Sequence, residues 1–188
     1  MTRGRHLGRS IRGLTLACAV LTTGLMAGVF YAFAVSVNLG LAERPDASYV
    51  ATMNEINERI QNPLFFLGFF GAVLFPVAAL VAHLPRRRSG RFRLIVLACV
   101  LYAAGSFLVT ALANVPLNEE LARVTSDAPS SELARARAAY EEPWNFWNGV
   151  RGLFSAVAFV ALIGACCAKT PRPGERRFGA AHRSGSDA

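Results

Sequence analysis

Two rows of polar side chains interrupt otherwise apolar segments, and these are the residues of the chain best suited to chemistry. One row has a polar residue at every fourth position: Tyr102, Ser106, Thr110, Asn114 and Asn118. The other row follows a helical spacing of four, three and four residues: Trp144, Asn148, Arg151 and Ser155. Each spacing places its members on one helical face. Amides donate and accept hydrogen bonds and a guanidinium stabilises an anionic oxygen, so the two rows together predict a binding site for a polar group.

The segments that carry these rows are long and apolar enough to cross a membrane. Hydrophobic residues make up 53% of the 188 residues and charged residues 17%, against about 25% charged residues in a typical soluble protein. A bilayer core about 30 Å thick requires roughly 20 helical residues. The sequence therefore predicts an all-α integral membrane four-helix bundle, which excludes a cytosolic enzyme or a secreted disulfide scaffold. The predicted spans cover residues 14–37, 63–84, 94–113 and 150–168.

Charged residues are divided unequally between the two ends of the predicted bundle. Fourteen of the 20 Lys and Arg residues lie in the two tails and the loop at 85–93, whereas ten of the 12 Asp and Glu residues lie in the other two loops. The positive-inside rule then predicts a plasma-membrane protein with both termini cytoplasmic. Residues 1–13 form a basic tail, and the composition of 169–188 predicts a disordered basic tail. The net charge of +8 reflects this topology, and we expect lipid rather than nucleic acid as the partner.

Both outer loops contain patterns typical of short amphipathic helices that would lie over the outer end of the bundle. In the first loop an apolar residue recurs at helical spacing, at Met53, Ile56 and Ile60, and Asp46 is a candidate N-cap. The second loop predicts a separate short helix at 134–142, after which Pro143 would occupy the first turn of the fourth span.

Small residues also recur at every fourth position of the first span, at Gly24, Gly28, Ala32, Ser36 and Gly40. Such a stripe allows close approach of another helix. We interpret it as a packing surface within the bundle, with homodimerisation as the alternative.

The residue types that hold cofactors are missing from the predicted interior. The four cysteines contain no Cys-x-x-Cys pair, and we expect them to be small buried apolar residues: Cys18, Cys99, Cys166 and Cys167. The three histidines, His6, His83 and His182, lie at or beyond the cytoplasmic ends of the spans, and no carboxylate lies within a span. The sequence thus predicts neither a metal nor an organic cofactor.

The position of Arg151 near the outer end of the fourth span allows two interpretations. If the two polar rows face each other, Arg151 lies at the rim of a polar pocket in the outer half of the bundle. Alternatively, Arg151 extends to the interface and forms an ion pair with Glu119, Glu120 or Glu142, while Trp144 and Trp147 belong to the interfacial aromatic belt.

Four motifs in order resemble the anthrone-oxygenase-like family of small four-helix membrane proteins, over about residues 14–168. They are the segment 24–33, Met53-x-x-Ile-Asn57-x-x-Ile-x-Asn62-Pro63, Asn114-Val-Pro-Leu-Asn118 and Trp144-x-x-Trp-Asn148-x-x-Arg151. One departure is Leu39-Gly40-Leu41, where the family often has Pro-Gly-Leu.

The resemblance implies oxidation of an anthrone-like polycyclic phenol by O₂ without a cofactor. It implies catalytic roles for Arg151, Asn148, Asn114 and Asn118, with Glu58, Glu119 and Tyr102 as alternative bases. The implied substrate-binding residues are Trp144, Trp147, Tyr102, Thr110, Ser155, Asn57 and Asn62. The alternative is a non-catalytic protein that binds a small aromatic or amphiphilic ligand, or a protein partner, through the same pocket. The oligomeric state stays open.

Overall fold

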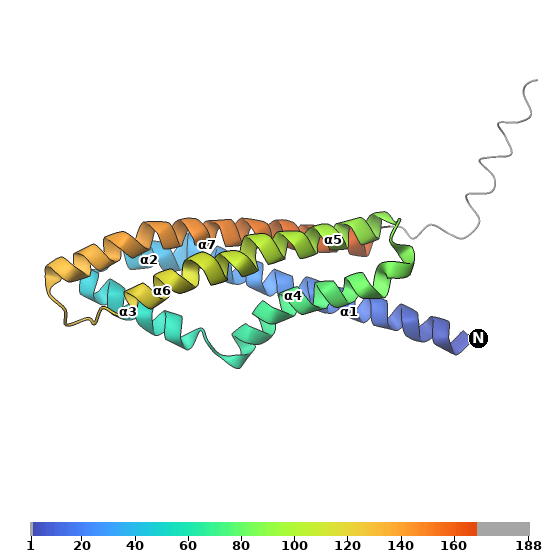
Figure 1. The fold of residues 1–188 in the computed structure, drawn as a ribbon, viewed down its shortest axis with the longest axis horizontal. Coiled ribbons are helices and arrows are strands. Elements are labelled where there is room, and N and C mark those ends of the chain that lie inside the picture. Colours follow the sequence, from blue (N-terminus) through green and yellow to red (C-terminus); the bar gives the residue numbers. More distant parts are fainter. Residues whose placement is uncertain (1, 169–188) are drawn as a thin grey trace, which may run out of the picture.

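The computed structural model describes residues 2–168, and four helical segments in this range are long and apolar enough to cross a membrane (Figure 1). These segments are Ser10–Ala42, Pro63–Arg86, Gly90–Leu121 and Ser130–Cys167. The predicted all-α bundle is therefore confirmed, and the chain is a multi-pass membrane protein. The predicted tail at 169–188 lies outside the described residues, and the part of the predicted basic tail from Thr2 to residue 13 is helical, because the first helix begins at Thr2.

The four segments pack as a closed ring around one apolar core. Helix α1 (Thr2–Ala32) packs against α4 (Pro63–His83) and α7 (Ser130–Cys167), and α5 (Gly90–Tyr102) packs against the same two helices. Small and apolar residues fill the centre; Ala19, Ala79, Ile95, Ala158 and Leu162 are among those with no exposed surface. Large exposed apolar residues cover the outside of the ring, as expected for helices that face lipid.

Two of the four membrane segments contain π-helical turns in their halves at the end of the bundle opposite the N-terminus. The first segment continues from α1 through a π-turn at Phe33–Val37 into α2 (Asn38–Ala42). The third continues from α5 through π-turns at Ala103–Leu108 and Thr110–Asn114 into α6 (Val115–Leu121).

These π-turns explain how the polar row of the third segment stays on one face. In a regular α-helix, residues spaced by four drift by about 40° per step around the axis, so a row of five would wind away from the bundle interior. A π-turn contains more residues per turn and reverses part of that drift. Accordingly, Tyr102, Ser106 and Asn114 are all buried although they span three turns.

Helix α3 (Asp46–Arg59) lies at the end of the bundle opposite the N-terminus and packs against α6 and α7 (Figure 1). Its buried residues Tyr49, Val50 and Met53 join a second apolar cluster with Leu133 and Tyr140 of α7. The short amphipathic helix predicted in the first outer loop is thus present. The predicted N-cap is wrong: Pro45 occupies the cap position and Asp46 is the first helical residue, because its carboxylate pairs with Arg137 instead.

The prediction of a separate helix at 134–142 is also wrong, because α7 runs unbroken from Ser130 to Cys167 with Pro143 inside it. Proline removes one backbone hydrogen bond and often ends a helix. Here the flanking turns are held by burial, since Tyr140 and Trp144 have exposed fractions of 2% and 5% and their rings stack on each other with centroids 6.1 Å apart. Packing on both sides of the proline outweighs the lost hydrogen bond.

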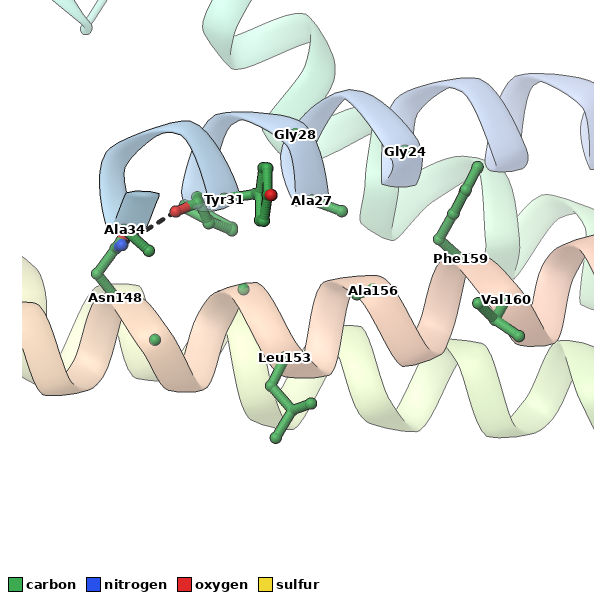
Figure 2. Close-up of a pocket in the computed structure, with 13 residues that line it drawn as sticks. Gly24, Ala27, Gly28, Tyr31, Ala34, Asn148, Leu153, Ala156, Phe159 and Val160 are labelled. Atoms are coloured by element: carbon green, nitrogen blue, oxygen red, sulfur yellow. Dashed lines mark hydrogen bonds between the residues drawn. The ribbon is translucent and has the colours of Figure 1, made fainter. Parts of the chain in front are cut away.

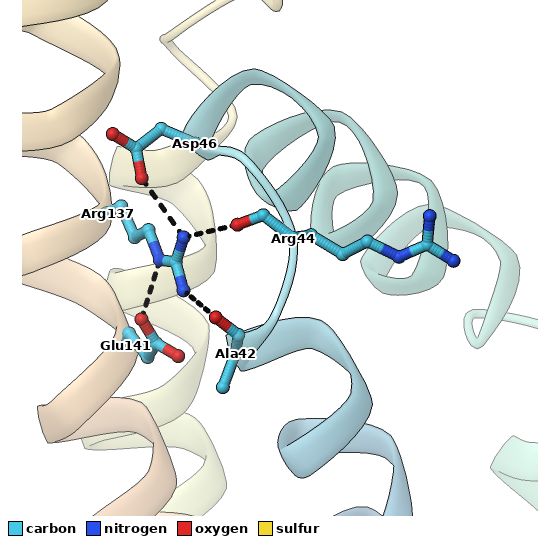
Figure 3. Close-up of polar contacts among 5 residues, drawn as sticks. All are labelled: Ala42, Arg44, Asp46, Arg137 and Glu141. Atoms are coloured by element: carbon cyan, nitrogen blue, oxygen red, sulfur yellow. Dashed lines mark hydrogen bonds and ion pairs between the residues drawn. The ribbon is translucent and has the colours of Figure 1, made fainter.

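Arg137 joins α7 to the turn between α2 and α3, as Figure 3 shows. Its Nε donates to Glu141 Oε2 at 2.7 Å, and its Nη1 donates to Asp46 Oδ1 at 3.0 Å and to the Arg44 carbonyl at 2.7 Å. Its Nη2 donates to the Ala42 carbonyl at 2.8 Å. The guanidinium also lies over the Tyr49 ring, 4.5 Å from the centroid. This cluster fixes the start of α3.

The small-residue stripe of the first span serves packing over only part of its length. A Cβ at Gly24 would lie 2.7 Å from Phe159 Cε2, so the close approach of α1 and α7 requires glycine there. At Gly28 and Gly40 a Cβ would meet no atom within 4 Å. The expectation of buried cysteines is wrong as well: Cys18 and Cys99 are half-buried, and Cys166 and Cys167 are exposed, because the latter two lie at the end of α7, past the packed core.

Candidate functional site

The two polar rows face each other across the contact between the third and fourth membrane segments. Ser106 Oγ and Ser155 Oγ are 2.7 Å apart. One turn further out, Arg151 Nη1 donates to Thr110 Oγ1 at 3.3 Å. The rows therefore line the interior of the bundle rather than its lipid-facing surface, and the outer residues of both rows open onto a common cavity.

This cavity, which we call the polar cavity, has a volume of about 600 Å³ and is lined in part by α3, in the half of the bundle away from the N-terminus. Its walls come from α1, α3, α4, α6 with the preceding π-turn, and α7. Aromatic residues form one part of the wall: Phe30, Phe33, Phe65, Phe66, Phe69 and Trp144. Polar residues form another part and contact the aromatic rings at Arg151 and Asn118; they are Asn54, Asn57, Thr110, Asn114, Asn118, Asn148 and Arg151. The size suits a small organic ligand, since such pockets typically measure about 300–1,000 Å³.

Arg151 is buried in the wall of the polar cavity with an exposed fraction of 6%. Its Nη2 donates to Asn148 Oδ1 at 3.1 Å, and its guanidinium carbon lies 4.4 Å from the Phe30 ring centroid and 5.3 Å from the Trp144 centroid. Within residues 2–168, Arg151 forms no ion pair with Glu119, Glu120 or Glu142. The alternative interpretation, in which Arg151 forms an ion pair at the interface, is therefore wrong. Neutral partners hold this cation, and a buried cation without a counter-ion favours an anionic ligand.

Three buried polar atoms of cavity-lining residues have no hydrogen-bond partner among the described residues: Arg151 Nε, a donor, and Asn54 Oδ1 and Asn114 Oδ1, both acceptors. The Asn114 amide nitrogen makes only a long contact, 3.5 Å, to the Trp144 carbonyl. Because unpaired buried polar groups are costly, their presence in a cavity wall indicates that a ligand or water completes them. A ligand that satisfies all three carries an acceptor oxygen for Arg151 Nε and donor groups for the two amide oxygens.

Asn118 holds the outer rim of the cavity together. Its Oδ1 accepts from Tyr140 Oη and from Trp144 Nε1, each at 2.9 Å. Tyr140 Oη in turn accepts from Asn57 Nδ2 at 3.2 Å. This chain of hydrogen bonds joins α3, α6 and α7 and fixes the orientation of the Trp144 ring. Asn118 and Asn57 thus line the cavity while their amides are engaged by the protein itself.

Four residues expected at the site do not line the cavity. Tyr102 lies below it and donates to the Phe69 carbonyl at 3.2 Å, and Ser155 lies below it paired with Ser106. Trp147 packs on Phe146 with ring centroids 5.1 Å apart. Asn62 caps α4, accepting from the Leu64 and Phe65 amides at 3.1 Å each. Their contacts support the walls from outside.

Sequence reasoning missed the aromatic wall. Phe33 lies against Trp144 with centroids 5.6 Å apart, and Phe69 stacks on Phe65 and Phe107. Phe30 and Phe33 lie within the segment 24–33, which the resemblance had already singled out, but an aromatic residue in an apolar span gives no sign of whether it faces lipid or a cavity. Tyr140 was also missed, although it lies one turn before Trp144 on the same helical face.

Carboxylates reach the cavity only at its rim, where Glu58 and Glu119 contribute to the lining. Of the three bases considered from the sequence, these two border the cavity and Tyr102 does not. Across residues 2–168, no three side chains among His, Cys, Asp and Glu group closely enough to hold a metal ion. The chemistry available in the cavity is therefore hydrogen bonding, one buried positive charge, aromatic contact and proton transfer at the rim.

A family model described as anthrone oxygenase matches residues 55–161, more than half of the chain. The chain belongs to the anthrone oxygenase family. The resemblance inferred from the four motifs is thereby confirmed. The anthrone oxygenase match includes Arg151 and every polar wall residue of α6 and α7, whereas Phe30 and Phe33 of the first segment lie outside it. Neither the curated proteins nor the solved structures contain a match to this chain.

Proposed function

We propose that the protein oxidises a polycyclic phenol of the anthrone type with O₂ in the polar cavity. The observation that carries this proposal is the buried Arg151 guanidinium, which has no carboxylate partner in the described part of the chain and lies between two aromatic rings. A flat aromatic ligand fits against these rings, and its oxygen completes the free Nε.

Arg151 stabilises the anion that begins the reaction. An anthrone loses a proton from the methylene carbon between its rings, and the negative charge moves onto the ring oxygen. A guanidinium already oriented toward that oxygen stabilises the anion without rearrangement. A phenolic hydroxyl next to the same oxygen would donate to Asn114 Oδ1, one of the two unpaired acceptors among the cavity-lining residues. Arg151 and Asn114 are therefore the proposed catalytic residues, and Asn148 orients Arg151 through the contact at 3.1 Å.

The oxidation needs no electron carrier, because O₂ itself accepts the electrons. The carbanion transfers one electron to O₂, and the resulting radical and superoxide combine to form a carbon–oxygen bond. The hydroperoxide then loses its remaining methylene proton, the O–O bond breaks, and water leaves. One anthrone and one O₂ give one anthraquinone and one water. The protein binds the ligand, removes a proton and stabilises charge.

We assign the base that removes the ligand's proton to Glu58 or Glu119, because both carboxylates border the cavity. The interior wall of the cavity offers only neutral groups and Arg151. Asn118 positions the Trp144 ring through the bond at 2.9 Å. Trp144, Thr110 and Asn57 contact the ligand, whereas Trp147, Tyr102, Ser155 and Asn62 support the walls.

The test is O₂ uptake by purified protein in nanodiscs with dithranol, a dihydroxyanthrone, after treatment with a metal chelator. Wild type should consume O₂ and form the anthraquinone faster than the autoxidation measured in empty nanodiscs. Arg151→Met removes the charge and retains the length, and it should lower the rate at least 100-fold, since a charge-assisted hydrogen bond contributes about 1.5–3 kcal/mol and a second donor adds to it. If the wild-type protein gave only the autoxidation rate of empty nanodiscs, the proposed enzymatic activity would be refuted.

The same experiment distinguishes the alternative of a binding protein without catalysis. A protein that only binds an amphiphile through the polar cavity would slow autoxidation of dithranol, because sequestered ligand is shielded, and Arg151→Met would then restore the background rate.

We further propose that the cavity faces the outside of the plasma membrane, with both termini cytoplasmic, because the arginines gather at the opposite end of the bundle. The exposed thiols of Cys166 and Cys167 should resist a membrane-impermeant maleimide in intact cells and react after lysis. A thiol introduced by Arg135→Cys, at an exposed position near the other end, should react in intact cells. The reverse labelling pattern would contradict this topology and indicate the opposite orientation.

A further inference from the structure

A second hollow lies on the lipid-facing side of the bundle, between α1 and α7 (Figure 2). We call it the α1–α7 groove. Its volume is about 490 Å³. Small residues form both walls and leave the space open, among them Gly24 and Gly28 on α1 and Gly149, Gly152 and Ala156 on α7. Tyr31, Leu153 and Val160 stand at its edge with 63–66% of their surface exposed, so in a membrane the groove opens to lipid.

The groove and the polar cavity share two lining residues. Phe30 of α1 and Asn148 of α7 line both spaces. The Asn148 amide nitrogen donates to the Phe30 carbonyl at 3.1 Å, and this bond closes the seam between the two helices. On the cavity side, the same two residues contact the Arg151 guanidinium. A molecule in the groove is thus one side chain away from the proposed catalytic group.

Two features flank Phe30 and Asn148. Gly149 follows Asn148 directly, and a Cβ at Gly149 would meet no atom within 4 Å. On α1, the π-turn at Phe33–Val37 begins three residues after Phe30, and π-turns interrupt the regular hydrogen bonding of a helix. In the structure, the Asn148–Phe30 hydrogen bond and the packing of Phe30 close the passage between the two spaces.

The polar rim of the cavity, away from the groove, is unsuited to the entry of an apolar molecule. Glu58, Gln61 and Glu119 surround it, and a polycyclic phenol that entered there would first leave the bilayer for water. Apolar surface favours the hydrocarbon phase by about 25 cal/mol per Å², so such a ligand concentrates in the membrane. The polar rim instead suits the exchange of protons and water.

We infer that the α1–α7 groove is the entry site for the apolar ring system of the ligand, which passes from lipid into the polar cavity between Phe30 and Asn148. This inference rests on the proposed function, since it takes its ligand from there. It adds a membrane-facing binding site in which the rings are held by van der Waals contact before the ligand oxygen reaches Arg151.

The test fills the groove without touching the cavity. Gly28 and Gly149 line the groove, and a Cβ at either position meets no atom within 4 Å. Leucine stabilises a helix relative to glycine by roughly 1 kcal/mol, so Gly28→Leu and Gly149→Leu should both fold. Gly13→Leu is the matched control, because a Cβ at Gly13 also meets nothing within 4 Å and Gly13 lines neither space.

Entry is measured without turnover, under anaerobic conditions, with protein in liposomes and dithranol as the probe. The chain has two tryptophans, and Trp147→Phe leaves Trp144 in the cavity wall as the reporter whose fluorescence the ligand quenches. We expect at least tenfold slower quenching in Gly28→Leu and Gly149→Leu, with an unchanged final extent, and wild-type kinetics in Gly13→Leu. Unchanged rates in both groove variants overturn the entry site and leave the proposed function intact. No quenching in the wild type overturns the proposed function itself.

Discussion

Replacing Arg137 with alanine should loosen the helix that covers the polar cavity. Arg137 is the main polar link between α7 and the start of α3, through two carboxylates and two backbone carbonyls (Figure 3). Its side chain is 16% exposed, while those of Glu141 and Asp46 are 23% and 40% exposed. Solvent therefore screens the Asp46 contact more than the Glu141 contact.

The magnitude follows from these contacts. The Glu141 bond contributes about 1.5 kcal/mol as a shielded charge-assisted bond. The more exposed Asp46 pair contributes about 0.5 kcal/mol, and the two carbonyl bonds together add about 1 kcal/mol. The total of about 3 kcal/mol corresponds to a roughly 100-fold rise in the population of the detached helix, at about 1.4 kcal/mol per factor of ten. Burial, reinforced by the Glu141 charge, raises the pKa of the Tyr49 hydroxyl, so a neutral ring stays beneath the guanidinium.

Hydrogen exchange of the protein in nanodiscs measures this effect locally. Amides of α3 should exchange about 100-fold faster in Arg137→Ala, whereas amides of α5 should be unchanged. Arg137→Lys should recover part of the protection, because an ammonium group reaches one carboxylate but lacks the planar fork. Arg135→Ala is the control, since Arg135 is exposed and forms no ion pair in the described range. Equal protection of α3 in Arg137→Ala and wild type would refute the tethering role.

Two further variants test the supports of the cavity. Asn118→Leu leaves Tyr140 Oη and Trp144 Nε1 without their common acceptor and should destabilise the protein by about 2–3 kcal/mol, seen as a lower midpoint of thermal unfolding in detergent; an unchanged midpoint contradicts the network. Gly105→Ala places a Cβ against the Phe154 side chain and should cost about 1–3 kcal/mol through overpacking, which Phe154→Ala should partly relieve; a stable single variant contradicts this packing.

The polar half of the site was predictable because polarity is rare in a membrane span. When serine, threonine or asparagine recurs at every fourth position of an apolar membrane helix, the orientation with the lowest free energy is toward other helices. Ser106, Thr110 and Asn114 followed this rule. The whole row stays on one face of the helix only because π-turns correct the helical drift. No residue pattern in the sequence predicted those turns.

The apolar half could not be predicted, for the opposite reason. Phe30, Phe65 and Phe69 line the cavity or its floor, yet Phe70 and Phe146 are exposed on the outside. Both settings are apolar, so hydropathy does not separate them. The partners of Arg151 were missed because a charge in a span suggests an opposite charge nearby, whereas Thr110, Asn148 and two rings surround it. Pro143 was misread because packing by Tyr140 and Trp144 outweighs a local helix-ending signal.

The central claim is that Arg151 stabilises the anion of a ligand bound in the polar cavity, and the acidity of that ligand tests it most directly. Dithranol changes its absorption spectrum when it loses a proton, so its pKa can be titrated anaerobically in the bound state. A charge-assisted hydrogen bond of about 1.5–3 kcal/mol lowers the pKa of the ligand by roughly one to two units. We predict this decrease for dithranol bound to the wild type and its loss in Arg151→Met. Bound dithranol with the same pKa in both proteins would contradict the account.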